Sequence, residues 1–147
     1  MSMGDIFTIA GSGMSAQTVR LNTVSSNIAN ADSVSSSVGG TYRAREPVFK
    51  AVQQALYDAN NGGQPLALGQ DAAGVQVAGI VESQAPLQMK FEPQNPYADK
   101  NGYVAYPNVN VVEEMANMIS ASRSFQTNVD VMNTAKTLMQ KTLTLGQ

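Results

Sequence analysis

The sequence contains no cysteine, no histidine and no tryptophan. Disulfides, thiolate nucleophiles, imidazole bases and the commonest zinc sites are therefore excluded. Serines such as Ser122 have no histidine to activate them as nucleophiles. Glu113 and Glu114 are adjacent, so on a helix they do not face one another, and helix capping explains them without catalysis. We expect no catalytic site, no metal site and no cofactor.

Charge is also scarce, at 14% of residues against a usual value of about a quarter. A fully solvated surface normally carries more charge, so we expect much of this surface to face other protein. The net charge of -2 and the scattered basic residues give no basis for holding a polyanion, and we expect no nucleic acid as a partner. The nearest basic cluster is Arg43, Arg45 and Lys50, which we interpret as part of a solvated strand.

Long apolar runs are missing too. No stretch approaches the ~20 apolar residues that span a bilayer, so we expect no membrane insertion. The N-terminus lacks the basic and apolar regions of a secretory signal, and Asp5 interrupts what apolarity there is. If the protein leaves the cytoplasm, we expect a route that uses no cleaved signal peptide.

The first strong pattern is a seven-residue repeat from Asp5 to about Ala31. Such a repeat predicts a helix with the apolar seam of a coiled coil, and Asp5 can cap its start. Gly11 and Gly13 each cost about 1 kcal/mol relative to Ala inside a helix, so we expect this helix to need a partner. One line of the seam is Phe7, Met14, Leu21 and Ile28, and the other is Ala10, Gln17, Val24 and Ala31.

A second seven-residue repeat begins near Asn110. Asn110 is a good N-cap, and Glu113 stands in the capping-box position. Heptads at both ends of one chain favour antiparallel pairing of two helices. One line of this repeat is Val111, Met118, Phe125, Met132 and Met139, and the alternate line is Met115, Ser122, Val129, Lys136 and Leu143.

Between the two repeats the pattern becomes β-like. Residues 75–81 and 87–91 alternate apolar with polar side chains, which predicts two half-buried strands. Residues 48–57 fit either a short helix or a strand, and Asn101-Gly102 favours a type I′ turn. The predicted fold class is α+β. Long heptad helices over residues 1–32 and 110–147 pair into a helical inner layer, with a linker and a small β-rich domain over residues 33–109.

Gly11 to Ala16 match the G-x-G-x-x-A pattern of dinucleotide-binding enzymes, and Asp32 lies where a ribose-binding carboxylate would stand. That function needs a strand before Gly11 and a second strand ending at Asp32. The apolar heptad instead runs straight through the glycines. We therefore favour small residues that permit close helix contact.

Beyond periodicity, three stretches carry a family resemblance. Residues 20–33, RLNTVSSNIANADS, resemble the N-terminal signature of flagellar rod and hook proteins. Residues 102–136 and the terminus KTLTLGQ, together with FEPQNPYAD before residue 102, are similar to the proximal rod protein family of the flagellar basal body, the FlgC family. The segment Gln53–Gly69 departs from the family by its length. The motif residues of the signature are Asn27, Ile28, Ala29, Asn30 and Asp32.

The resemblance implies a structural subunit of the flagellar basal-body rod, located in the periplasm, and no enzyme or small-molecule substrate. It implies export by the flagellar type III apparatus and helical stacking with other rod subunits and with itself, as part of the drive shaft and export channel. A self-contained helical oligomer, such as an adaptor or chaperone, is the alternative. The expected assembly residues are Phe7, Met14, Leu21, Val24, Ile28, Val111, Met118, Phe125, Met132 and Met139.

Overall fold

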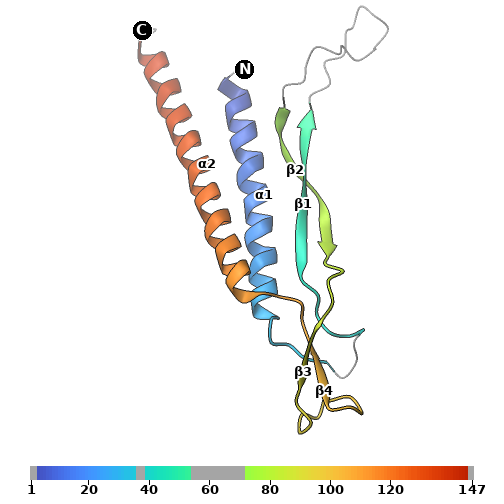
Figure 1. The fold of residues 1–147 in the computed structure, drawn as a ribbon. Coiled ribbons are helices and arrows are strands. Elements are labelled where there is room, and N and C mark those ends of the chain that lie inside the picture. Colours follow the sequence, from blue (N-terminus) through green and yellow to red (C-terminus); the bar gives the residue numbers. More distant parts are fainter. Residues whose placement is uncertain (1–2, 36–38, 54–71, 146–147) are drawn as a thin grey trace, which may run out of the picture. The chain divides into compact units, whose positions relative to one another are not determined.

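The computed structural model of this 147-residue chain describes residues 3–35, 39–53 and 72–145. Within these ranges two long helices, α1 (Met3–Ala29) and α2 (Val111–Leu145), enclose four strands in the sequence order (Figure 1). This arrangement confirms the predicted α+β fold class. Neither of these helices combines the length and apolarity that crossing a membrane requires.

The four strands form two separate pairs. β1 (Arg45–Gln53) pairs with β2 (Ala72–Glu82), and β3 (Gln88–Phe91) pairs with β4 (Tyr103–Tyr106). The second pair is antiparallel, with Gln88 opposite Tyr106 and Phe91 opposite Tyr103. The strands predicted over residues 75–81 and 87–91 are confirmed, but the expected half-burial is wrong: every side chain of β3 is exposed, and among residues 75–81 only Val77 is half-buried.

For residues 48–57, the strand interpretation is right and the helix interpretation is wrong over residues 48–53, which belong to β1. Two β-branched residues, Val48 and Val52, favour the extended backbone there. Residues 54–57, and nearly all of the segment Gln53–Gly69, lie outside the described residues.

The chain divides into two compact units. The first comprises Met1–Thr18, Phe49–Ala78 and Arg123–Gln147, and the second comprises Val19–Val48 and Gly79–Ser122. Both long helices, and the strands β1 and β2, therefore contribute one segment to each unit. The two units are described separately below.

The starts of the two helices differ in how well the sequence predicted them. α1 begins at Met3, so Asp5 lies in the first turn, where a carboxylate complements the helix dipole, and the predicted cap at Asp5 is wrong. α2 is capped as predicted, because Asn110 Oδ1 accepts a hydrogen bond from the Val112 backbone N–H at 3.2 Å. Glu113 is exposed and makes no side-chain hydrogen bond among the described residues, so the reciprocal half of the capping box is not formed.

The turn before β4 is not the predicted type I′ turn. The Gly102 N–H donates to Asp99 O at 2.9 Å, and Asp99 Oδ1 accepts from the Asn101 N–H at 2.7 Å. Gly102 therefore closes the turn with a φ of +82°, and no non-glycine residue in the described ranges has a positive φ. Type I′ geometry requires a positive φ at both central residues, and here the side chain of Asp99 stabilises a turn one residue earlier.

The core of the second unit lies where α1 ends and α2 begins. Ala31, Ala44 and Val109 form a buried cluster, against which Tyr42 and Val111 pack. The small side chains of Ala31 and Ala44 allow the backbone segments after α1 and before β1 to approach closely. This cluster positions the polar junction described next.

Candidate assembly interface

Asn27, in the last two turns of α1, is the centre of a polar junction in the second unit. Its side chain is only 1% exposed. The amide nitrogen Nδ2 donates to Arg45 O and to Glu114 Oε2, both at 2.9 Å. The amide oxygen Oδ1 accepts from the Tyr42 hydroxyl at 2.8 Å and from the Arg45 N–H at 3.0 Å. All four hydrogen-bonding positions of the side chain are used, so its burial leaves no polar group unsatisfied.

The junction continues along α1 and α2. Glu114, whose Oε2 contacts Asn27, accepts at Oε1 from Asn117 Nδ2 at 3.5 Å. Asn117 Oδ1 in turn accepts from Arg20 Nη2 at 3.0 Å. The contacts 27–114 and 20–117 run in opposite directions along the two helices. The helix segments of this unit are therefore antiparallel neighbours, as the terminal heptads indicated.

Asn108 makes a second connection in the same unit. Its Oδ1 accepts from the Ala44 N–H at 2.8 Å, and its Nδ2 donates to Ala85 O at 3.0 Å. Arg43 Nη1 also donates to Ala85 O, at 3.2 Å. The side chain of Asn108 therefore joins the entry to β1 with the segment that follows β2. The sequence interpretation did not single out this residue, because one Asn before a helix resembles many others.

The Gly-Ser-Gly sequence at residues 11–13 serves packing within the first unit. A Cβ on Gly13 would lie 2.9 Å from Asn128 Nδ2 on α2, and Ser12 Oγ accepts from the Val75 N–H of β2 at 3.1 Å. Gly74 has a φ of +137°, and a Cβ there would collide with Ser12 Oγ. Close contact thus accounts for Gly13, whereas Gly11 has no such neighbour.

The dinucleotide-binding interpretation is wrong. Residues 11–16 lie inside α1, so no strand precedes Gly11 and no tight turn forms there. Asp32 lies in a turn after the helix and is exposed. The backbone N–H groups that would cradle a pyrophosphate at a helix start are inside a continuous helix instead.

The predicted assembly residues lie mostly on partly covered helix faces. Val24 is buried, and Met139 is exposed. The others are half-buried within the subunit: Phe7, Met14, Leu21, Ile28, Val111, Met118, Phe125 and Met132.

The alternate line predicted on α2 is wrong. Met115, Ser122, Lys136 and Leu143 are exposed, and Val129 is half-buried. The positions one residue earlier include Ala121 and Ala135, which are 0% and 3% exposed. Small alanines let the backbone of α2 approach its neighbours closely, whereas the seven-residue count had selected the adjacent Ser122 and Lys136.

The motif residues have distinct roles. Asn27 is the centre of the junction, and Asn30 Nδ2 donates to Ser26 O at 2.8 Å, which satisfies a carbonyl at the end of α1. Ile28 is half-buried, and Ala29 and Asp32 are exposed. The signature therefore encodes a helix end and its connection to α2 and β1.

α2 also presents large apolar side chains that the described residues leave uncovered. Val112 is 76% exposed, and Ile119 is 66% exposed. Sequence reasoning missed these positions because they fall outside both heptad lines. Val131 and Leu138, further along the helix, are also exposed and outside both lines, and Leu143 is exposed on the alternate line.

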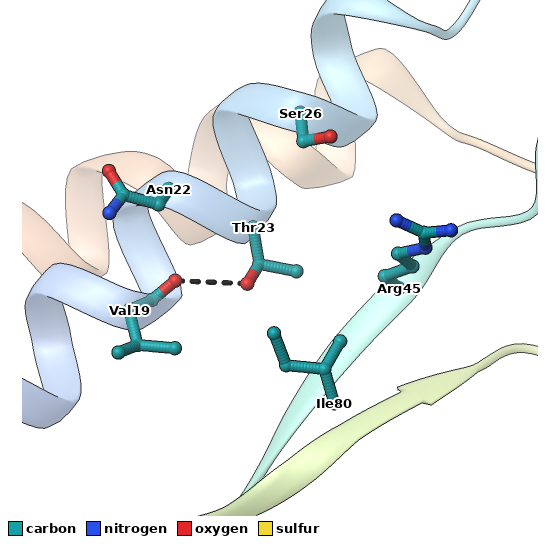
Figure 2. A pocket seen from close by; sticks show the side chains of 6 residues that line it. All are labelled: Val19, Asn22, Thr23, Ser26, Arg45 and Ile80. Atoms are coloured by element: carbon teal, nitrogen blue, oxygen red, sulfur yellow. Dashed lines mark hydrogen bonds between the residues drawn. The ribbon is translucent and has the colours of Figure 1, made fainter.

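A shallow groove of about 290 Å³ lies between α1 and the strands β1 and β2 in the second unit. Figure 2 shows Ile80 and Arg45 on the strand side, facing the helix, with the Thr23 methyl group directed toward them. The Thr23 hydroxyl donates to Val19 O at 2.9 Å, which leaves the methyl group to line the groove. The complete lining is Val19, Asn22, Thr23, Ser26, Arg45 and Ile80.

The hydroxyl of Tyr106, on β4 in the second unit, has a shifted pKa. Its hydroxyl donates to both carboxylate oxygens of Glu92 at 3.1 Å, and Lys90 Nζ lies 4.1 Å from the centre of its ring. Desolvation, the hydrogen bond to Glu92, and the negative charges of Glu92 and Asp32 raise the pKa of Tyr106. The phenol therefore stays protonated at neutral pH and acts here as a structural donor.

Comparison with known proteins gives matches at both ends of the chain. Residues 7–35 match the family described as flagella basal body rod protein, and residues 100–145 match the C-terminal family of flagellar basal body rod FlgEFG proteins. The flagellar basal-body rod protein FlgC of Salmonella typhimurium is 52% identical over 147 residues, which covers 100% of both chains. The FlgC proteins of Yersinia enterocolitica and Borreliella burgdorferi are 52% and 35% identical, covering 100% of this chain and 100% and 99% of their own.

The alignment with the Borreliella burgdorferi protein extends over 158 positions. That relative therefore has residues that this 147-residue chain lacks. With full-length identity of this level, the chain belongs to the FlgC family of flagellar basal-body rod proteins and is a structural subunit of that rod.

Proposed function

We propose that this subunit assembles helically with other rod subunits and with further copies of itself, into part of the drive shaft and export channel that crosses the periplasm. The exposed large apolar side chains of α2 support this proposal most directly. Val112 and Ile119 in the second unit, and Leu138 and Leu143 in the first, are more than half exposed. Large exposed apolar side chains on a weakly charged surface are typical of protein interfaces.

In the proposed assembly, the helical regions over residues 1–32 and 110–147 form an inner layer, and residues 33–109 lie outside it. The expected assembly residues that the subunit leaves partly or fully exposed would complete their burial against neighbouring subunits, whereas Val24 is already buried within the subunit. These positions are Phe7, Met14, Leu21, Ile28, Val111, Met118, Phe125, Met132 and Met139. A structural role of this kind requires no cofactor, and family membership gives no reason to expect an enzymatic activity.

The direct experiment is isolation of hook-attached basal bodies with detergent, followed by mass spectrometry. We expect peptides of this chain in the basal bodies, and we expect rods to be missing from a strain in which its gene is deleted. Complete basal bodies without the protein would contradict a structural role in the rod.

We further propose that the flagellar type III apparatus recognises the N-terminal region for export. Removal of residues 2–30 should abolish secretion into the medium of a hook-deficient strain, while removal of residues within 53–69 should leave it nearly unchanged. Undiminished secretion of the first variant would refute the proposal. Cytoplasmic levels of both variants, measured by immunoblotting, separate an export defect from degradation.

A further inference from the structure

We infer that the groove of one subunit receives the first turns of α2 from a second copy of this chain. The receiving surface is the groove lined by Val19, Asn22, Thr23, Ser26, Arg45 and Ile80. The inserted surface, called the ridge below, consists of Val112, Met115 and Ile119. This inference rests on the proposed rod assembly and specifies one contact within it.

The groove fits protein side chains better than a small molecule. Pockets for small molecules enclose most of the ligand and present convergent polar groups, whereas this groove is shallow and open to solvent. Its hydroxyls are already engaged: Thr23 donates to Val19 O, and Ser26 Oγ lies 3.3 Å from the Tyr42 hydroxyl. What remains toward the groove is mainly aliphatic, contributed by Val19, Ile80 and the Thr23 methyl group (Figure 2).

The ridge has the spacing of a helix that binds in a groove. Val112, Met115 and Ile119 are separated by three and four residues, so they share one face of α2. They are 76%, 51% and 66% exposed. Amphipathic helices that enter apolar grooves use anchors at this spacing. The ridge therefore has the spacing and exposure needed to bind in a small aliphatic groove.

Groove and ridge belong to the same compact unit, yet both are open in the single subunit. The ridge of one chain therefore does not fill its own groove. A two-fold pair in which each ridge fills the other copy's groove would close and stop growth, whereas the proposed rod must extend, so we take the contact to be head-to-tail. Repetition of a head-to-tail contact that does not close generates a helical filament, which is the form that a rod requires.

Charge supports the same occupant. Glu113 follows Val112 in the first turn of α2, about 100° around the helix from it, is exposed, and has no side-chain partner among the described residues. Arg45 borders the groove, and its guanidinium is about half exposed. Its Nε and Nη2 both donate to a single oxygen, Glu82 Oε1, at 3.2 and 3.0 Å. Since a guanidinium has five N–H donors, Arg45 can donate to a second carboxylate, such as that of Glu113 of the incoming copy.

Disulfide cross-linking tests this contact, and because the chain contains no cysteine, native thiols of this chain cannot form competing disulfides. The double variant Ile80→Cys/Val112→Cys places one thiol in the groove and one on the ridge. After mild oxidation of isolated basal bodies, a head-to-tail contact predicts a ladder of dimers, trimers and longer species on non-reducing gels. Each single variant should remain monomeric. The matched control is Ile80→Cys/Val131→Cys, which places the second thiol on an exposed valine of α2 outside the ridge and should give no ladder.

The cross-linking result can fail while the proposed rod function holds. Intact rods that contain the double variant but give only monomer would overturn the inference while leaving the rod assignment in place. A ladder of equal strength in the Val131 control would also overturn it. If the wild-type chain were absent from complete basal bodies, the proposed function itself would fail.

A second experiment tests the same contact without cross-linking. Ile119→Asp places a charge on the exposed ridge, so the purified subunit should keep the wild-type circular dichroism spectrum and Tm. Swimming should fall to the level of the gene deletion, because the charge cannot enter the aliphatic groove. Normal swimming of this strain would contradict the inference.

Discussion

Asn27 and Glu114 lie 87 positions apart in the chain, and their side chains meet at 2.9 Å between Nδ2 and Oε2. This hydrogen bond joins the end of α1 to the first turn of α2. It also explains why Asn and not Asp stands at position 27: the amide donates to Glu114 and to Arg45 O while its oxygen accepts two further bonds. An aspartate could supply the acceptors but not the donors.

Asn27→Asp should therefore destabilise the subunit. The substitution removes two donors in a buried site and sets a second carboxylate against Glu114, at a cost of about 1–3 kcal/mol or more. Urea unfolding of the purified protein measures this loss. The matched control is Asn22→Asp, on an exposed position of the same helix, which should change stability by less than about 0.5 kcal/mol. Equal effects of the two substitutions would show that the junction contributes nothing specific.

Adding Glu114→Gln to Asn27→Asp should restore part of the stability. The glutamine amide can donate to the new carboxylate and removes the charge repulsion, while Arg45 O still lacks its donor. A double-mutant cycle measures this coupling. Simple additivity of the two substitutions would argue against direct contact between positions 27 and 114.

The two glycines of α1 should respond oppositely to alanine. Gly11→Ala meets no atom within 4 Å and should stabilise the protein by up to about 1 kcal/mol through helix propensity. Gly13→Ala places a Cβ 2.9 Å from Asn128 Nδ2 and should lose that gain. Thermal unfolding compares the two variants directly. Asn128→Ala combined with Gly13→Ala should recover the gain, and identical Tm values for Gly11→Ala and Gly13→Ala would contradict the close helix contact.

Alkaline pH should weaken the β3–β4 pair through Tyr106. Because the pKa of Tyr106 is raised in the folded protein, the folded state holds the phenolic proton more tightly than the unfolded state. The corresponding stability is fully present below about pH 10, the ordinary tyrosine value, and is lost as the pH rises through the higher folded pKa. Tyr106→Phe should lose less Tm than the wild type between about pH 9 and pH 11. Equal losses of Tm in the wild type and in Tyr106→Phe would rule out a contribution of Tyr106 to the alkaline destabilisation.

The sequence was sufficient for the helices and for two of the strands because these depend on local periodicity. Asn110 as the cap of α2 and the strand alternation around Val77 and Met89 are of this kind. The junction at Asn27 was predictable only as a motif, since its partners Tyr42 and Glu114 are distant in the chain. Nothing local distinguishes a buried asparagine from an exposed one.

The alternate line of α2 failed for a related reason. The seven-residue count selected Ser122 and Lys136, whereas the buried positions are the neighbouring Ala121 and Ala135. Close contact between backbones favours such small side chains, and a pattern traced through large apolar residues does not reveal them. The large residues that this choice leaves outside, such as Leu138, then become available to other molecules. Their exposure could be read only from the structure.

The most direct test of assembly through α2 uses Leu138, which is 52% exposed. Phe125 is half-buried in the subunit, so a charge there would disturb folding and assembly together. Burying one large apolar side chain contributes about 1.5–3 kcal/mol, whereas burying an unpaired charge is strongly unfavourable. The measurement is electron microscopy of basal bodies from Leu138→Asp cells, beside Gln140→Asp cells in which an exposed polar residue of the same helix is replaced. We expect the purified Leu138→Asp subunit to fold normally and its cells to lack complete rods, with rods present in the control. Complete rods with hooks in the Leu138→Asp strain would contradict assembly through the exposed face of α2.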